Sequence, residues 1–235
     1  MKRDTISSYL EFVRSLKDTH TTEKAMELAI GGNFHAFGIL QRELLIQFGL
    51  QPDHYVIDVG CGSGRLAKPL SRYLRGRYLG TDVIPDLIDY ARAIANRPDW
   101  RFEVVDSITI PEDDNQADFV CFFSVFTHLL HEESFLYLQE ARRCLRDGGK
   151  VIFSFLEFKI PSHWYTFEES IRNFGKNVTP VQFISRDAIR AWATHLKLDI
   201  ETIESGDRPH IPLQEPVTLD DGQIMKEKGN LGQSI

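Results

Sequence analysis

Short, continuous apolar runs alternate with stretches of helical periodicity through the middle of this chain. The runs predict five buried strands, at residues 55–59, 77–82, 101–105, 118–124 and 150–156. Helices are expected directly after the first strand, at 85–95 and at 132–145. Strands that alternate with helices are typical of a parallel sheet covered by helices on both faces. The pattern therefore predicts an α/β fold with a doubly wound sheet.

Helical patterns also precede this alternating region. Two apolar stripes, at residues 9–16 and 36–48, predict helices that Gly31-Gly32-Asn33 separates. The sheet does not need these helices to form. We therefore expect them to cap the carboxyl ends of the strands, where open α/β sheets bind ligands.

The region after the fifth strand is less regular. Residues 157–183 are rich in aromatic side chains, which could equally line a pocket, cover the sheet edge or form a dimer contact. Ser185 is the expected N-cap of a helix that runs to about Leu196, and residues 198–203 predict a sixth strand. A long loop is expected from Gly206 to Gly229.

The length fits one domain, because 235 residues with 42% hydrophobic content can bury one sizeable core. We expect a single domain over residues 1–235, made of a helical cap (1–50), a ligand-binding core (51–156), a substrate-side insertion (157–183) and the C-terminal part of the sheet (184–235).

Charge and cysteine content exclude several classes of function. The net charge of −7 argues against a nucleic-acid partner, whose phosphates need clustered Lys and Arg. No apolar run is long enough to span a bilayer, so no membrane partner is expected. Three widely spaced cysteines are typical of a reduced compartment, which predicts a cytoplasmic protein.

A glycine-rich turn follows the first strand at Gly60, Gly62 and Gly64. Glycine has no Cβ, so the backbone can adopt positive φ and a ligand can approach the main chain. Dinucleotide-binding loops need G-x-G-x-x-G, whereas here the third glycine comes one position early and Arg65 stands where glycine is required. The turn predicts a site for a small ligand and disfavours a nicotinamide-dependent reductase.

Acidic residues follow the next strands in order. Asp82 ends the second strand, eighteen residues after Gly64, where a carboxylate can accept hydrogen bonds from both hydroxyls of a ribose. Residues 106–108 (Asp-Ser-Ile) follow the third strand, and residues 125–129 (Val-Phe-Thr-His-Leu) follow the fourth.

Together, the motif Asp58-x-Gly60-x-Gly62-x-Gly64 and the acids behind it resemble the class I S-adenosylmethionine-dependent methyltransferases. The resemblance covers residues 51–156. It implies a seven-stranded, mostly parallel sheet of order 3-2-1-4-5-7-6 with strand 7 antiparallel, and residues 231–235 resemble the start of that strand. The turn at 145–150 is similar to the L-x-P-G-G turn of the family, with Asp147 in place of proline.

The resemblance implies S-adenosyl-L-methionine as the cofactor and S-adenosyl-L-homocysteine as its product. It places Asp82 on the ribose and residues 106–108 near the adenine amino group. For Asp106, a surface acid or helix cap is an equal alternative. The implied cofactor-binding residues are Asp58, Gly60, Cys61, Gly62, Gly64, Asp82, Val83, Asp106, Ser107, Ile108, Phe123 and Ser124.

His128 is the candidate catalytic residue. A sulfonium methyl is already electrophilic, so the protein mainly has to hold the acceptor in line with the S–CH3 bond. A hydroxyl acceptor has a high pKa and benefits from a general base, and His128 follows the fourth strand at the reactive edge. The alternative is a histidine that orders the loop or contacts substrate without taking a proton. His131 and Glu132 lie near it, but no further metal ligand is apparent, so no metal site is predicted.

We expect methyl transfer to a small molecule, with a hydroxyl oxygen of a sugar or secondary metabolite as the acceptor. The alternatives are N-methylation of a small molecule and a catalytically silent protein that binds S-adenosylmethionine as a sensor or scaffold. Enzymes that methylate adenine or glutamine are similar to one another in an Asn/Asp-Pro-Pro-Tyr run, which residues 123–126 (Phe-Ser-Val-Phe) replace. A monomer or homodimer is expected.

Overall fold

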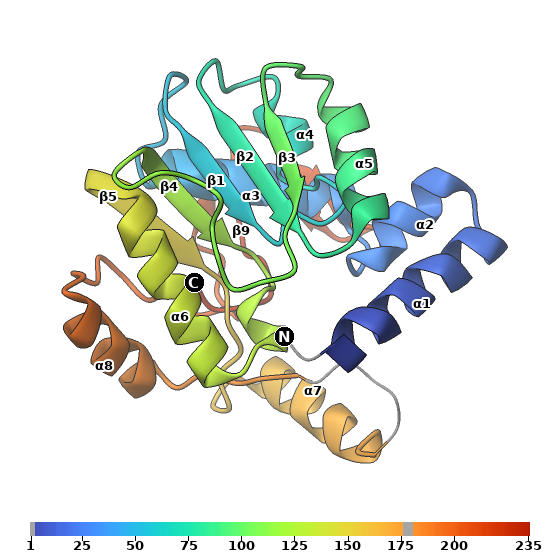
Figure 1. Cartoon of the computed structure of the whole chain (residues 1–235). Helices are drawn as coiled ribbons and strands as arrows, with labels where there is room; N and C mark the ends of the chain where they lie inside the picture. The colour runs from blue at the N-terminus through green and yellow to red at the C-terminus, as the bar shows by residue number, and fades with distance from the viewer. Residues whose placement is uncertain (1–2, 176–180) are drawn as a thin grey trace.

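A five-stranded sheet forms the centre of the computed structural model, which describes residues 3–175 and 181–235. Its strands are β1 (Val56–Val59), β2 (Tyr78–Asp82), β3 (Arg101–Val104), β4 (Ala117–Phe122) and β5 (Leu145–Phe153). All neighbouring strands pair in parallel, in the order β3-β2-β1-β4-β5 (Figure 1). Every residue of β1 and β4 is buried, which explains why both strands are apolar except for one aspartate each, Asp58 and Asp118. The predicted α/β fold is confirmed.

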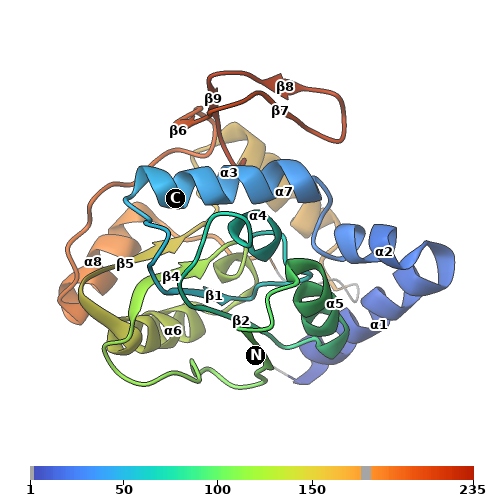
Figure 2. The same ribbon diagram turned by 90° about the horizontal axis from the view of Figure 1, so that it is seen from above.

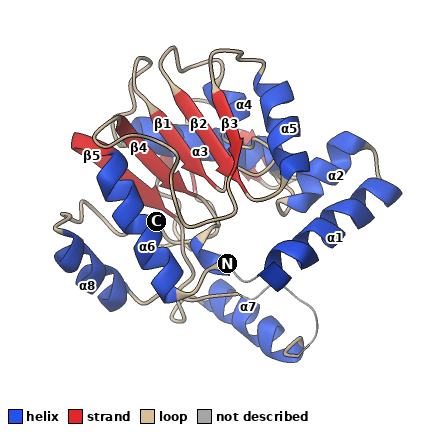
Figure 3. Cartoon of the chain, viewed as in Figure 1, coloured by secondary structure: helices blue, strands red, loops and turns tan. Residues whose placement is uncertain are grey.

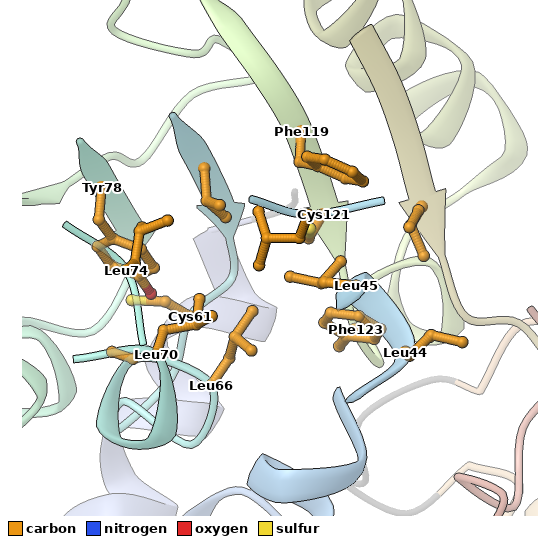
Figure 4. Close-up of a cluster of buried hydrophobic side chains, with 14 of the residues drawn as sticks. Leu44, Leu45, Cys61, Leu66, Leu70, Leu74, Tyr78, Phe119, Cys121 and Phe123 are labelled. Atoms are coloured by element: carbon orange, nitrogen blue, oxygen red, sulfur yellow. The ribbon is translucent and has the colours of Figure 1, made fainter. Parts of the chain in front are cut away.

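Helices cover both faces of the sheet (Figure 2). Three of them pack on one face: α3 (Phe34–Gln47), α4 (Ala67–Leu70) and α5 (Pro85–Ala95). The other face is covered by α6 (His131–Cys144) and α8 (Arg186–Leu196). Figure 4 shows Leu45 of α3 beside Cys121 of β4, and Leu44 near Phe123, in the first of these cores. Part of the predicted N-terminal cap, α3, therefore belongs to the core.

The remaining N-terminal helices, α1 (Arg3–Thr19) and α2 (Thr22–Ala29), form a hairpin that stands beside α5 (Figure 3). Val13 and Met26 from the hairpin share a small buried cluster with Leu87 of α5. Lys17 of α1 forms an ion pair with Asp86 of α5 at 2.7 Å. The hairpin is thus fixed next to the end of β2, where α5 begins.

The main difference from the predicted fold concerns strands six and seven, which the described residues do not form as part of the central sheet. Residues 198–203 are irregular, and only single residue pairs continue the sheet beyond β5. Phe155 and Ser234 exchange two backbone hydrogen bonds of 2.9 and 3.0 Å, and Glu204 and Ile235 exchange two of 2.9 and 3.1 Å. Gly232 has a φ of +68°, which interrupts the extended backbone and stops a longer antiparallel strand from forming.

The C-terminal region contains further short elements. The aromatic insertion forms α7 (Pro161–Arg172), and the expected N-cap of α8 is confirmed, because Ser185 Oγ accepts a hydrogen bond from the Ala188 N–H at 3.1 Å. The predicted long loop instead holds two nested antiparallel pairs that lie over α3. They are β6 (Ile211–Pro212) with β9 (Lys228–Gly229), and β7 (Val217–Thr218) with β8 (Ile224–Met225).

The three cysteines are buried and form no disulfide. Among the described residues, no helix combines the length and apolarity needed to cross a bilayer. The cytoplasmic location stays a prediction.

Candidate functional site

A cavity of about 730 Å³ opens at the carboxyl ends of the strands. It lies beside the point where the chain order reverses between β1 and β4, which is where open α/β sheets bind ligands. Its walls come from the glycine turn, the ends of all five strands, α7 and both terminal regions of the chain.

The cavity brings together nearly all of the residues predicted from the sequence. The following predicted residues line it: Asp58, Gly60, Cys61, Gly62, Asp82, Val83, Asp106, Ser107, Ile108, Phe123, Ser124 and His128. Gly64 is the exception among the predicted residues. A Cβ on Gly64 would lie 2.9 Å from the Ala91 Cα of α5, so this glycine permits close helix packing and does not line the cavity.

The glycine turn lies in the left-handed region that glycine tolerates. Gly60 has a φ of +71° and Gly62 a φ of +54°. The N–H groups of Gly60 and Cys61 both donate to the Thr81 carbonyl, at 2.8 and 2.9 Å. These bonds fasten the turn to the end of β2, so the backbone of the turn is held at the edge of the cavity.

Asp82 links the turn to the next helix. Its Oδ2 accepts from the Gly62 N–H at 2.9 Å, and its Oδ1 accepts from the Ile84 N–H at 3.0 Å. Burial raises the pKa of Asp82 to about 6, although these backbone N–H groups stabilise the charged form. A carboxylate oxygen has more than one lone pair, so Asp82 can accept further hydrogen bonds from a ligand.

Asp58 is buried beneath the turn. It accepts a hydrogen bond from the Tyr78 hydroxyl at 2.8 Å, and burial raises its pKa to about 7. The native state therefore holds this proton at pH values where the unfolded chain has lost it. Between about pH 4 and pH 7, Asp58 makes stability fall as the pH rises.

We expect Asp58→Asn to remove this pH dependence, because asparagine keeps an acceptor for Tyr78 and never ionises. The difference in free energy of unfolding between variant and wild type should shift in favour of the variant by about 2 kcal/mol from pH 5 to pH 8. Urea unfolding at both pH values measures it. Asp89→Asn, at a side chain 74% exposed, is the control. An equal difference at pH 5 and pH 8 would contradict the role of Asp58.

The end of β4 is strained. Ser124 has a φ of +60°, which is unfavourable for a residue other than glycine. Its N–H donates to Ser154 Oγ at 2.7 Å, and its carbonyl accepts from Thr127 Oγ1 at 2.9 Å. Strain of this kind persists where surrounding bonds hold it, and it is common at functional sites.

The two histidines that follow β4 point to different places. His128 ends a short 3-10 helix (Phe126–His128) and lines the cavity with an exposed side chain. His131 lies on α6, with its Nε2 2.9 Å from the Phe183 carbonyl and its ring against Trp192. Within residues 3–175 and 181–235, no group of three or more His, Cys, Asp or Glu side chains could hold a metal ion.

Arg65 connects the glycine turn to the N-terminal hairpin. In the sequence this residue was notable only as a departure from the dinucleotide-binding pattern. Its guanidinium donates to the Gly32 carbonyl at 2.8 Å and also to the Ile30 carbonyl. Ser63 Oγ donates to the Met26 carbonyl at 2.8 Å. These bonds seat the end of α2 directly on the glycine turn.

Nothing in the sequence indicated that the C-terminal residues Leu231, Gly232 and Gln233 would line the cavity. They do so together with Ser162 and Thr166 of α7, which lies in the predicted substrate-side insertion. Residues 231–233 lie in an irregular segment that has no periodic pattern. Only the tertiary structure brings them to the site.

Comparisons with known proteins agree with this geometry. Residues 56–149 match the family described as "Methyltransferase domain". Phosphoethanolamine N-methyltransferase 1 from Arabidopsis thaliana is 28% identical over 162 residues, which are 66% of this chain and 32% of the plant protein. A ubiquinone biosynthesis O-methyltransferase from Coxiella burnetii is 24% identical over 147 residues, 59% of this chain and 61% of the bacterial protein. The chain thus spans less than two thirds of either relative.

Solved structures show the same fold. A putative methyltransferase from Haloferax volcanii, solved in complex with the Trm112 methyltransferase activator, superimposes with a TM-score of 0.62 at 18% identity. The likeness covers 94% of this chain and 82% of that one. At this identity it concerns the fold alone.

Proposed function

Since this chain belongs to the class I S-adenosylmethionine-dependent methyltransferases, we propose that it methylates a hydroxyl oxygen of a small molecule. The observation that carries the proposal is the cavity, which extends from the end of β3 to the end of β5. Neighbouring parallel strands lie about 4.8 Å apart, so the cavity spans roughly 20 Å across the sheet. That length can hold an adenosyl cofactor and an acceptor side by side.

The cofactor half is proposed over β1, β2 and β3. Asp82 would accept hydrogen bonds from the ribose hydroxyls, and the segment from Asp106 to Ile108 would contact the adenine. The three acids that line this half, Asp58, Asp82 and Asp106, give it a negative character that favours a positively charged sulfonium. S-Adenosylmethionine would supply the electrophilic methyl group when bound.

The acceptor half is proposed over β4 and β5. There His128 would take the hydroxyl proton, so that the acceptor oxygen could bond to the methyl group that S-adenosylmethionine would supply, with the sulfur leaving as a thioether. The strand ends and the bonds around Ser124 would keep this side of the cavity rigid, which favours alignment of the acceptor with the methyl group.

We expect His128→Ala to lower kcat about 100-fold with little change in affinity for S-adenosylhomocysteine, because only proton removal is lost. Release of S-adenosylhomocysteine in the presence of a hydroxyl acceptor measures kcat. The exposed His20, on the N-terminal side of α2, provides the control His20→Ala. An acceptor amine that binds as the free base needs no general base. Unchanged turnover in His128→Ala would therefore count against the hydroxyl acceptor and favour N-methylation.

Calorimetric titration with S-adenosylmethionine, S-adenosylhomocysteine and NADH tests the proposed function itself. Micromolar binding of both adenosyl ligands without binding of NADH is the expected result. Adenosyl binding without methyl transfer to any acceptor would favour the silent sensor or scaffold. Failure to bind either adenosyl ligand would overturn the proposed function.

A further inference from the structure

The acceptor half of the cavity has a different chemical character from the cofactor half. The charged side chains among the described lining residues are Asp58, Arg65, Asp82 and Asp106. All four lie in or shortly after β1, β2 or β3, on the cofactor side of the cavity. The polar lining groups near β4, β5 and α7 are hydroxyls, imidazoles and the amide of Gln233, while α3 contributes a second lining amide, Gln41.

The orientation of the Gln233 amide is fixed by two serines. Ser154 Oγ donates to Gln233 Oε1 at 2.6 Å, and Ser124 Oγ donates to the same oxygen at 3.3 Å. Ser154 Oγ already accepts the Ser124 N–H, so its own hydrogen is available for Oε1. With Oε1 turned to the serines, the amide nitrogen Nε2 is on the opposite side of the planar group.

We infer that this nitrogen is available to a ligand in the cavity. Gln233 lines the cavity, and in the part of the chain that the structure describes no residue accepts a hydrogen bond from Nε2. A donor in such a place is satisfied by water or by a ligand acceptor atom.

The segment that carries Gln233 is held on both sides. Ser234 Oγ donates to Glu157 Oε1 at 2.6 Å and accepts from the Gly206 N–H at 3.2 Å. His163 Nδ1 accepts from the Glu157 N–H at 2.9 Å, and its Nε2 lies 2.9 Å from the Gly232 carbonyl. A donor held this firmly loses little conformational entropy when it binds a ligand.

The same bonds define the charge of this half. His163 is buried, and because Nδ1 accepts a hydrogen bond, the Gly232 carbonyl must receive the proton on Nε2. His163 is therefore neutral and cannot serve as a counterion. Beside Gln233 and His163, a charged acceptor group would lose its hydration without a paired charge, which is costly; the exposed His128 is the other imidazole among the described lining residues of this half.

From these contacts we propose that Gln233 is an acceptor-binding residue, whose Nε2 donates a hydrogen bond to a carbonyl or hydroxyl oxygen of an uncharged acceptor. The inference rests on the proposed function for the division of the cavity into two halves. It adds the chemical class of the acceptor and a residue that selects it.

Four probes with one phenyl ring test the proposal: acetophenone (uncharged, with an oxygen), ethylbenzene (no oxygen), benzoate (negative) and benzylammonium (positive). Each is titrated into the full chain, with and without S-adenosylhomocysteine, while the side-chain amide signal of Gln233 is followed by 15N NMR. Gln233→Leu assigns that signal by removing it. Acetophenone should shift the signal and bind at least fivefold more tightly than the other three.

Two variants and one control sharpen the result. Gln233→Leu should weaken acetophenone binding about five- to tenfold, the loss expected for one hydrogen bond. Gln233→Glu keeps an acceptor for both serines but turns a negative oxygen to the cavity, so it should reverse the preference from acetophenone to benzylammonium. Gln223→Leu, at an exposed position of the turn between β7 and β8, should change nothing. S-Adenosylhomocysteine should bind all variants equally.

Failure of the proposed function and failure of the proposal for Gln233 give different results. If S-adenosylhomocysteine does not bind, the proposed function fails, whatever the probes do. If it binds, but acetophenone leaves the Gln233 amide unshifted or benzoate binds as well as acetophenone, the proposal for Gln233 is overturned. Equal acetophenone binding by Gln233→Leu and wild type would also overturn it.

Discussion

Asp82→Ala should weaken binding of S-adenosylhomocysteine by about 10²- to 10⁴-fold at pH 8. In the proposed binding mode the variant would lose two charge-assisted hydrogen bonds to the ribose, each of which contributes about 1.5–3 kcal/mol. It also loses the bonds that Asp82 accepts from the Gly62 and Ile84 N–H groups, so the glycine turn is held less firmly. The effect combines a lost contact with a looser binding surface. Isothermal calorimetry on the purified variant measures it.

The pKa of Asp82 supplies a second readout. Because that pKa is about 6, the carboxylate is ionised at pH 8 and largely protonated at pH 5. Wild-type affinity should therefore fall as the pH falls through about 6, and the affinity of Asp82→Asn should change less over the same range. The control is Asp89→Ala, on the exposed side of α5. Wild-type affinity in Asp82→Ala would show that Asp82 does not bind the cofactor.

Arg186→Leu should cost about 3–5 kcal/mol of stability, the loss expected when one partner of a buried ion pair is removed. Arg186 donates to both oxygens of Glu157, each at 2.8 Å, and Glu157 is only 3% exposed. Burial alone would raise the pKa of Glu157, but hydrogen bonds from Arg186 and Ser234 bring it below its usual range. Without the guanidinium, the buried carboxylate keeps only the Ser234 hydroxyl and the more distant, exposed Lys159, whose Nζ lies 3.4 Å from Oε2. For a chain of this length the melting temperature should fall by about 10 °C.

A matched variant lies one turn along the same helix. Arg190 also pairs with an acid, but Arg190 is 58% and Asp187 95% exposed, so Arg190→Leu should change stability by less than about 0.5 kcal/mol. The double variant Arg186→Leu/Glu157→Leu should be more stable than Arg186→Leu, because no charge stays buried. Chemical denaturation gives all three values. Equal losses in Arg186→Leu and Arg190→Leu would contradict the role of the buried pair.

The sequence predicted the centre of the fold well, because local patterns encode it. β1 and β4 are buried on both faces, so their residues are mostly apolar, with Asp58 and Asp118 as the exceptions. The glycine turn requires positive φ within a few residues, and α5 begins and ends where the helical stripe predicted, at Pro85 and Ala95. These features depend on neighbours along the chain, which a single sequence displays directly.

The edge of the sheet and half of the candidate site depend on distant contacts, which the sequence did not reveal. Gln233 reaches the cavity through hydrogen bonds to Ser124 and Ser154, which lie 109 and 79 residues away. Arg65 departs from the dinucleotide pattern, yet its side chain has a structural use in anchoring α2. Neither residue belongs to a periodic stripe. Their roles became visible only once the folded chain placed them beside their partners.

The cavity has one wall from the N-terminal region of the chain and another from residues 231–233, so it is completed late in synthesis. Tyr9 and Gln233 line the same space, while the strands between them form the sheet. During synthesis, the glycine turn and β1 to β5 are complete long before residues 231–233 leave the ribosome. A ligand that needs both walls cannot stabilise the growing chain and acts only on the finished one, where it would tie the two terminal regions together. Ligand-induced protection from proteolysis should therefore be shared by α1 and the segment around Gln233.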